Sequence, residues 1–336
     1  MNNLIIGITA EGSVNLLQGQ LAYFKAKGYK TYLLAPYSER SSAYCKREGC
    51  EHLVIDIERE ISLWKDFKTL IAIISIFKKV KPDIINLGTP KVSLLGMIAG
   101  FITGVPKRIY TCRGFRFEHE KGLKQKILIL MEKITSSLAH HVICISPSLR
   151  DFSLKKNIFN EEKTFVIEKG SSNGINLQNV TSKGANSKNE FKEDGSFVFG
   201  FVGRLVRDKG IFELLEVFDE INSKINNTKL LLLGSDLTSS ELDKNKLKKY
   251  ENHKSIEWLG FKEDVFSYIS IFDVLVVPTY REGFGNVFIE AACLGVPVIS
   301  SDIIGVRDAV SDGYNGILVP VKNKEKLKEA MLDLLK

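Results

Sequence analysis

Short apolar runs alternate with longer amphipathic segments along most of the 336-residue chain. The runs are rich in Ile, Leu and Val without period-two alternation, which is typical of strands covered on both faces. In the first half they predict strands at residues 4–8, 31–35, 53–55, 84–87, 108–111, 142–145 and 164–167. In the second half they predict strands at residues 197–202, 229–233, 256–259, 274–277 and 296–300.

Apolar residues at helical spacing predict helices between these strands. The clearest are at residues 16–27, 64–79, 123–138, 212–225, 265–271, 287–294 and 324–335. Strand and helix in regular alternation indicate an α/β chain with doubly wound parallel sheets. A polar stretch at 175–195 interrupts the pattern and is interpreted as a linker. We therefore expect two Rossmann-like domains, 1–174 and 196–336, facing a central cleft, since such sheets bind ligands at their carboxyl edges.

Composition and motifs exclude several classes of protein. With 44% hydrophobic and 26% charged residues, the chain is not a disordered one. Five cysteines without a CxxC pair argue against a disulfide framework and a zinc site, and we expect no bound metal or cofactor. The first strand ends in GITAEG rather than GxGxxG, which disfavours a dehydrogenase. The N-terminus lacks a basic leader and the longest apolar run, 92–105, is too short to span a bilayer, so we expect a cytoplasmic protein.

The net charge of +7 is distributed unevenly. Residues 1–175 carry 26 Lys and Arg against 16 Asp and Glu, whereas the remainder carries 21 against 24. The first half should therefore attract anions such as phosphate, nucleic acid or an anionic membrane. Between Lys107 and Lys133 there are eight basic residues against three Glu, close to Phe101, Phe115 and Phe117. This suits a bilayer surface, and a solvated helix is the alternative.

A first candidate site follows the strand at 197–202. Gly203 permits a close turn, and Arg204 and Lys209 then precede the next helix. A guanidinium, an ammonium and free helix N–H groups together suit a diphosphate. The alternative is a solvated basic turn.

A second candidate site lies in residues 278–300, PTYREGFGNVFIEAACLGVPVIS. The pattern predicts a strand, then a glycine-containing loop with Glu282, then a helix starting near Gly285. The free N–H groups of Phe284, Gly285 and Asn286 at the start of this helix can bind ligand oxygens. Glu290 lies within the helix among apolar neighbours, where a carboxylate needs a partner such as a vicinal diol. The alternative makes Glu282 a helix-entry charge and Glu290 a surface residue.

These segments match a family. GRLVRDKG, LLLLGSD, WLGFKEDV and the 278–300 segment occur in the order that resembles retaining GT-B nucleotide-sugar glycosyltransferases of glycosyltransferase family 4. Glu282 and Glu290 fit that family's E-x7-E element. RIYTCRGFRFEHEKG, VICISPSLRD and GSSNGI in the first half resemble the sugar transferases of bacterial capsule, O-antigen and exopolysaccharide assembly.

The resemblance implies a role for each matching residue. Arg204 and Lys209 would hold the donor diphosphate, and Glu290 would bind the ribose hydroxyls. Glu282 would face the donor sugar. Gly12 would close over the diphosphate from the first domain. The base would rest against the turn that contains Phe261 and Lys262, and the backbone of Gly283, Phe284 and Gly285 would face the sugar with Glu282. Gly203 and Asn286 complete the donor-binding positions.

The resemblance further implies a metal-independent, retaining hexosyltransferase that uses a nucleotide diphosphate sugar, expected to be UDP-linked. The acceptor would be a glycan or an undecaprenyl-diphosphate-type lipid, with the protein at the inner face of the membrane. Many members carry a histidine where this chain has Arg113 on the acceptor side, and arginine cannot act as a general base. Such folds also add a final helix, so the chain is truncated or crosses differently. The alternatives are a nucleotide-sugar epimerase or phosphorylase, or a basic nucleic-acid- or membrane-binding module.

Overall fold

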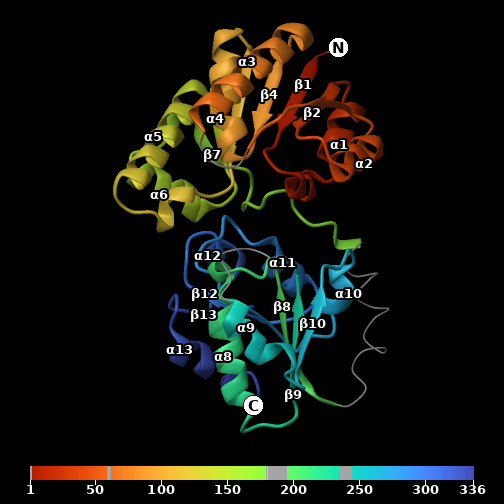
Figure 1. Cartoon of the computed structure of the whole chain (residues 1–336), viewed down its shortest axis with the longest axis vertical. Helices are drawn as coiled ribbons and strands as arrows, with labels where there is room; N and C mark the ends of the chain where they lie inside the picture. Colours follow the sequence, from red (N-terminus) through yellow and green to blue (C-terminus); the bar gives the residue numbers. More distant parts are fainter. Residues whose placement is uncertain (1, 59–61, 179, 181–194, 235–243) are drawn as a thin grey trace. The chain divides into compact units, whose positions relative to one another are not determined.

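The computed structural model describes residues 2–58, 62–178, 180, 195–234 and 244–336. Their contacts divide the chain into two units, Met1–Asn173 (unit 1) and Gly174–Lys336 (unit 2), each with its own parallel sheet (Figure 1). This confirms the predicted α/β architecture. Most of the expected linker at 175–195 lies outside the described residues, so its extent stays a prediction.

The sheet of unit 1 has seven strands in the order β3-β2-β1-β4-β5-β6-β7, all parallel. The strands are β1 (Asn3–Gly7), β2 (Lys30–Ala35), β3 (Glu51–Val54), β4 (Ile84–Leu87), β5 (Lys107–Cys112), β6 (His141–Cys144) and β7 (Thr164–Val166). Every strand predicted for the first half is present, displaced by at most two residues at either end. The order reverses between β1 and β4, which is the switch point of a doubly wound sheet.

Helices cover both faces of this sheet because right-handed crossovers in opposite directions leave it on opposite sides. They are η1 (Glu11–Leu17), α1 (Gln20–Ala26), α2 (Glu39–Glu48), α3 (Leu63–Val80), α4 (Pro90–Ile102), η2 (Arg116–His119), α5 (Gly122–Leu138), α6 (Pro147–Lys155) and η3 (Glu161–Lys163). Helix α4 packs against both α3 and α5 (Figure 1). The apolar run at 92–105 supplies most of α4, which is largely buried.

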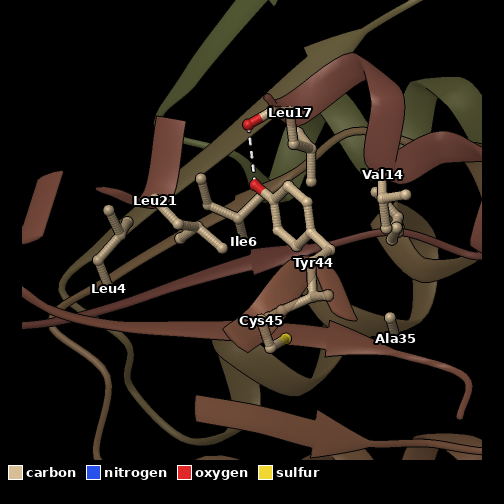
Figure 2. Packing of buried hydrophobic residues seen from close by; sticks show 10 residues of the cluster. Leu4, Ile6, Val14, Leu17, Leu21, Ala35, Tyr44 and Cys45 are labelled. Atoms are coloured by element: carbon tan, nitrogen blue, oxygen red, sulfur yellow. Dashed lines mark hydrogen bonds between the residues drawn. The ribbon is translucent and has the colours of Figure 1, made fainter. Parts of the chain in front are cut away.

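Figure 2 shows the core beneath β1 and β2, where the buried Tyr44 ring from α2 donates its hydroxyl hydrogen to the Leu17 carbonyl at 2.8 Å. The predicted helix at 16–27 is wrong in its first turn. A 3-10 segment ends at Leu17, Gly19 takes φ 76°, and α1 begins only at Gln20. The buried Glu48 carboxylate accepts hydrogen bonds from the N–H groups of Gly19 and Ala22, so a residue on α2 fixes where α1 starts.

Unit 2 repeats the plan with six parallel strands in the order β10-β9-β8-β11-β12-β13. The strands are β8 (Phe197–Val202), β9 (Thr228–Leu233), β10 (Ile256–Gly260), β11 (Val274–Val277), β12 (Val298–Ser301) and β13 (Gly316–Val319). The edge strand β13 was not predicted. The helices are η4 (Arg207–Lys209), α8 (Ile211–Asn222), α9 (Lys244–Glu251), α10 (Val265–Ile269), α11 (Asn286–Cys293), α12 (Val306–Ala309) and α13 (Lys324–Asp333). Within the described ranges, no helix combines the length and the apolarity needed to cross a membrane.

Candidate active site

The candidate site lies at the carboxyl edge of the unit 2 sheet, beside the point where strand order reverses between β8 and β11. Three glycines end neighbouring strands there. The N–H of Gly203 donates to the Leu233 carbonyl at 2.9 Å, and the N–H of Gly234 donates to the Gly260 carbonyl at 2.9 Å. A Cβ on Gly234 would lie 1.7 Å from the carbonyl oxygen of Gly203. The ends of β8 and β9 therefore meet backbone to backbone, since a side chain on Gly234 would overlap the Gly203 carbonyl.

Two basic side chains follow β8, as predicted, but they differ in their surroundings. Arg204 is exposed, and its guanidinium makes no hydrogen bond or ion pair with a residue that the structure describes. Lys209 ends η4 and forms an ion pair with Glu282, which stands 73 residues later. Both partners are largely buried. The sequence placed these two residues in separate candidate sites, and the structure brings them together.

The loop after β11 is fixed to the η4 segment by contacts that the sequence did not reveal. The Tyr280 N–H and the Thr279 hydroxyl both donate to the Asp208 carbonyl, at 2.7 and 3.1 Å. The Tyr280 hydroxyl donates to Glu213 on α8 at 2.5 Å, and Arg281 pairs with Asp208 at 2.8 Å. These contacts hold the loop that carries Glu282 against the turn that carries Lys209.

Helix α11 begins where the sequence predicted, with Gly285 at its N-cap in a left-handed conformation of φ 84°. Gly283, Phe284 and Gly285 are buried, so this loop is packed rather than open. Gly305, which also has positive φ (80°), lies directly beneath it. A Cβ on Gly305 would come within 2.6 Å of the Glu282 carbonyl oxygen and of Gly283. The position of the loop therefore depends on a glycine that sequence reasoning did not single out.

Glu290 lies within α11, and burial raises the pKa of its carboxyl to about 7. No side chain or backbone group among the described residues donates a hydrogen bond to this carboxylate. The sequence predicted an apolar setting in which this carboxylate needs a hydrogen-bond partner. None of the described residues supplies that partner. A carboxylate so placed favours hydrogen-bond donors that a ligand would supply.

The remaining predicted donor residues lie in separate places. Phe261 follows β10 with its side chain 55% exposed, and the Lys262 Nζ lies 5.5 Å from the centre of the Tyr268 ring. Gly12 is exposed at the start of η1 in unit 1, and a Cβ there would meet no atom within 4 Å. Packing within unit 1 therefore does not require glycine at position 12. Their roles toward a donor stay predictions.

Arg113 follows β5 in unit 1 and is largely buried against Gly88, where an added Cβ would lie 2.9 Å from the arginine Nε. Burial lowers its pKa to about 10, so the guanidinium stays charged at neutral pH. One of its amino groups donates to the Ser172 carbonyl at 3.3 Å, and its buried Nε has no partner among the described residues. Arg113, Thr111 and Asn86 line a cavity of about 500 Å³ within unit 1.

Comparison with known proteins gives concordant results for both halves. The family model of glycosyl transferases group 1 matches residues 182–336, and the glycosyl transferase 4-like model matches residues 8–146. The chain is 37% identical to the capsular polysaccharide biosynthesis glycosyltransferase CapM of Staphylococcus aureus, over 98% of this chain and 86% of that protein.

The chain is also similar to a second relative and to a solved structure. The chain is 29% identical to the UDP-Gal:alpha-D-GlcNAc-diphosphoundecaprenol alpha-1,3-galactosyltransferase of Escherichia coli, over 82% of this chain and 72% of that protein. The crystal structure of Anabaena Alr3699/HepE in complex with UDP and glucose superposes with a TM-score of 0.79 at 17% identity, covering 100% of this chain and 90% of that one.

Proposed function

Because the chain belongs to the glycosyl transferases group 1, we propose that it moves a sugar from a nucleotide diphosphate sugar to a lipid-diphosphate-linked acceptor in surface polysaccharide synthesis. The name of the Escherichia coli relative specifies UDP-galactose and a diphosphoundecaprenol-linked sugar, which supports a UDP-linked donor and an acceptor of this class. The relatives are glycosyltransferases, so the epimerase, phosphorylase and nucleic-acid-binding alternatives have no support.

In this proposal unit 2 binds the donor. Arg204 and Lys209 bind the diphosphate, and the Glu290 carboxylate accepts hydrogen bonds from the ribose hydroxyls. When the diphosphate engages Lys209, the ion pair with Glu282 weakens, which frees the Glu282 carboxylate to accept hydrogen bonds from the sugar. The other donor contacts are the positions predicted from the sequence: Gly12, Gly203, Phe261, Lys262, Gly283, Phe284, Gly285 and Asn286.

Transfer is proposed to retain configuration. The acceptor hydroxyl attacks the anomeric carbon from the side that the diphosphate leaves, and a diphosphate oxygen takes the hydroxyl proton. Arg204 and Lys209 stabilise the charge that develops on the departing diphosphate. No metal ion or cofactor is assigned a role. Arg113, charged at neutral pH, is proposed to contact the acceptor side without acting as a base.

The observation that carries the proposal is the joining of the two candidate sites at one sheet edge. Lys209 and Glu282 form an ion pair just before α11 begins, so a cation for a diphosphate and a carboxylate for sugar hydroxyls meet there, and the exposed Arg204 precedes Lys209 in the same turn. The protein is proposed to act at the cytoplasmic face of the membrane, where a lipid-linked acceptor is reached from the bilayer surface.

Arg204→Ala tests this proposal. Loss of a charge-assisted contact to the leaving group is expected to lower kcat/KM with a UDP-sugar by about a hundredfold or more. Lys254→Ala, which removes an exposed positive charge elsewhere in unit 2, is the control and should leave kcat/KM unchanged. Turnover that stays intact in Arg204→Ala would show that the diphosphate is bound elsewhere.

A further inference from the structure

Helix α5 exposes four large apolar side chains to solvent, while three of its four buried positions are polar. Its buried positions are Leu128, Glu132, Thr135 and Ser136. Its large exposed side chains are Leu123, Ile127, Leu130 and Ile134. The latter are spaced by four, three and four residues and so form one stripe along the helix. The buried Glu132 carboxylate has a hydrogen-bond partner, since it accepts a 2.7 Å hydrogen bond from the buried Tyr110 hydroxyl.

Helix α3, on the other side of α4, exposes a second apolar row toward its N-terminus. This row is Leu63, Trp64, Phe67 and Ile71, with exposed fractions from 51% to 87%. The Trp64 and Phe67 rings stack at 6.5 Å between centres. Helix α4 packs against both neighbours (Figure 1). Its Lys91 forms a buried 2.6 Å ion pair with Asp66 of α3. The three helices therefore form one layer.

The charged side chains that α3 and α5 present to solvent are all positive. The acidic residues of α3 and α5 are Asp66 and Glu132, and both side chains face inward. The two helices carry seven lysines: Lys65, Lys68, Lys78, Lys79, Lys124, Lys126 and Lys133. Lys65 and Lys124 pair with glutamates that precede the helices, and the other five form no ion pair with a described residue. Lys126 and Lys133 lie four residues before and three after Leu130, which places them beside the apolar stripe.

We propose that the outer faces of α3 and α5 are a docking surface for an anionic phospholipid bilayer. The eight exposed apolar residues and the lysines beside them are called the membrane face below. Leu, Ile, Trp and Phe side chains would enter the acyl boundary while the lysines contact anionic headgroups. A protein partner fits less well, because lysine is depleted in protein–protein interfaces. The inference rests on the proposed function in that a lipid-linked acceptor is presented at such a surface.

Vesicle flotation of the full chain tests the charge contribution. Wild-type protein is expected to float with vesicles of equal phosphatidylcholine and phosphatidylglycerol, and much less with phosphatidylcholine alone. Each lysine at an anionic surface contributes about fivefold in partitioning, so Lys126→Gln with Lys133→Gln should weaken binding about thirtyfold. Lys248→Gln with Lys254→Gln makes the same net charge change on exposed residues of unit 2 and should leave binding unchanged.

A second pair of variants tests the apolar contribution. Ile127→Ser with Leu130→Ser should lower partitioning by about tenfold or more, since both side chains lose apolar contact with the bilayer. Leu177→Ser with Ile225→Ser changes the same residue types at other exposed positions and serves as the control. Because all four side chains are exposed in the folded chain, the melting temperature should stay within a few degrees of wild type in both variants.

Trp64 reports directly on insertion. The chain has two tryptophans, so Trp258→Phe leaves Trp64 as the single indole. Its emission should shift to the blue on addition of anionic vesicles and be quenched by brominated lipid. Binding without this shift would place the contact on another surface and overturn the proposal.

Further outcomes separate the proposal from its alternatives. Wild-type protein that fails to float with anionic vesicles would overturn it. A dimer in sedimentation that the Ile127→Ser, Leu130→Ser variant dissolves would assign the surface to a second copy instead. With a short-chain, water-soluble lipid diphosphate as acceptor, the membrane-face variants should keep wild-type kcat/KM. Vesicle binding without transfer from any nucleotide sugar would reject the proposed function and leave the membrane face intact.

Discussion

The chemistry of Glu290 depends on where α11 places it. Its side chain is half-buried, no described residue donates a hydrogen bond to its carboxylate, and burial raises its pKa to about 7 from an ordinary 4.5. The ionised form is therefore poorly stabilised by the protein alone. Two ribose hydroxyls would donate hydrogen bonds to the ionised form, so nucleotide binding and proton release are expected to be linked.

Glu290→Gln should reveal that linkage. In the wild-type protein, affinity for a nucleoside diphosphate should rise as pH increases through about 7, because the carboxylate forms in that range. In the variant the rise should disappear, and affinity above pH 7 should fall by about tenfold to a hundredfold, as for loss of hydrogen bonds to a charged group. Calorimetric titration across this pH range measures both effects. Glu257→Gln, an exposed glutamate of the same unit, is the control.

The same shift has a signed consequence for stability. The folded protein retains the Glu290 proton up to about pH 7, whereas the unfolded chain loses it near 4.5. Glu290 therefore contributes a fall in the free energy of unfolding as pH rises across that interval, and Glu290→Gln removes this contribution, while Glu132, whose pKa burial also raises to about 7, contributes in both proteins. An equal pH dependence in both proteins would contradict the raised pKa.

Among the elements, the start of α11 is the most constrained part of the site. Gly305→Ala should destabilise the protein and displace the Glu282 loop, because the new Cβ would meet the backbone of Glu282 and Gly283 at 2.6 Å. The positive φ costs about 1–2 kcal/mol and the overlap about 1–3 kcal/mol more. Urea denaturation measures the stability, and the KM for the donor sugar should rise.

Gly295→Ala provides the matched control for that substitution. Gly295 follows α11 with a similar φ of 71°, but a Cβ there meets no atom within 4 Å. Only the conformational cost of about 1–2 kcal/mol should appear, with donor KM unchanged. If Gly305→Ala and Gly295→Ala had the same stability and the same donor KM, the close approach of Gly305 to the loop would not affect donor binding.

Most elements could be predicted from the sequence because buried parallel strands leave uninterrupted apolar runs. One exception has a physical cause. Residues 16–27 have a helical pattern, but Glu48, which caps α1 from another helix, moves its start to Gln20. Strand β13 is a four-residue edge strand that pairs only with β12 among the described strands; its length does not explain why it was missed, because the equally short edge strand β3 was predicted.

The site was predictable only where it is local. Glu282 and Glu290 are eight residues apart, and the loop and helix between them follow from the sequence pattern. The ion pair between Lys209 and Glu282 spans 73 residues and depends on β8 and β11 being neighbours in the sheet. The contact from Tyr280 to Glu213 spans 67 residues for the same reason. No spacing rule along the chain reveals such pairs before the strand order is known.

At the scale of the whole molecule, charge and chemistry divide along the same boundary. The first 175 residues hold the excess of positive charge and the membrane face, and the remainder is close to neutral with its basic and acidic site residues gathered at one sheet edge. In the described part of the chain each sheet is built from strands of one unit alone. Each unit should therefore unfold as a separate cooperative block.

Hydrogen exchange with UDP tests this division, because every proposed diphosphate and ribose contact except Gly12 lies in unit 2. A ligand at about a hundred times its Kd stabilises the folded state that binds it by about 2.7 kcal/mol, which is about a hundredfold slower exchange of core amides. That protection is expected in β8, β9 and β11, while β1, β4 and β5 of unit 1 should keep their rates. Arg204→Ala should remove the protection, whereas Lys254→Ala should not. Equal protection of both units would mean that they unfold together. Protection confined to unit 1 would place the nucleotide on unit 1 and contradict its proposed binding to unit 2.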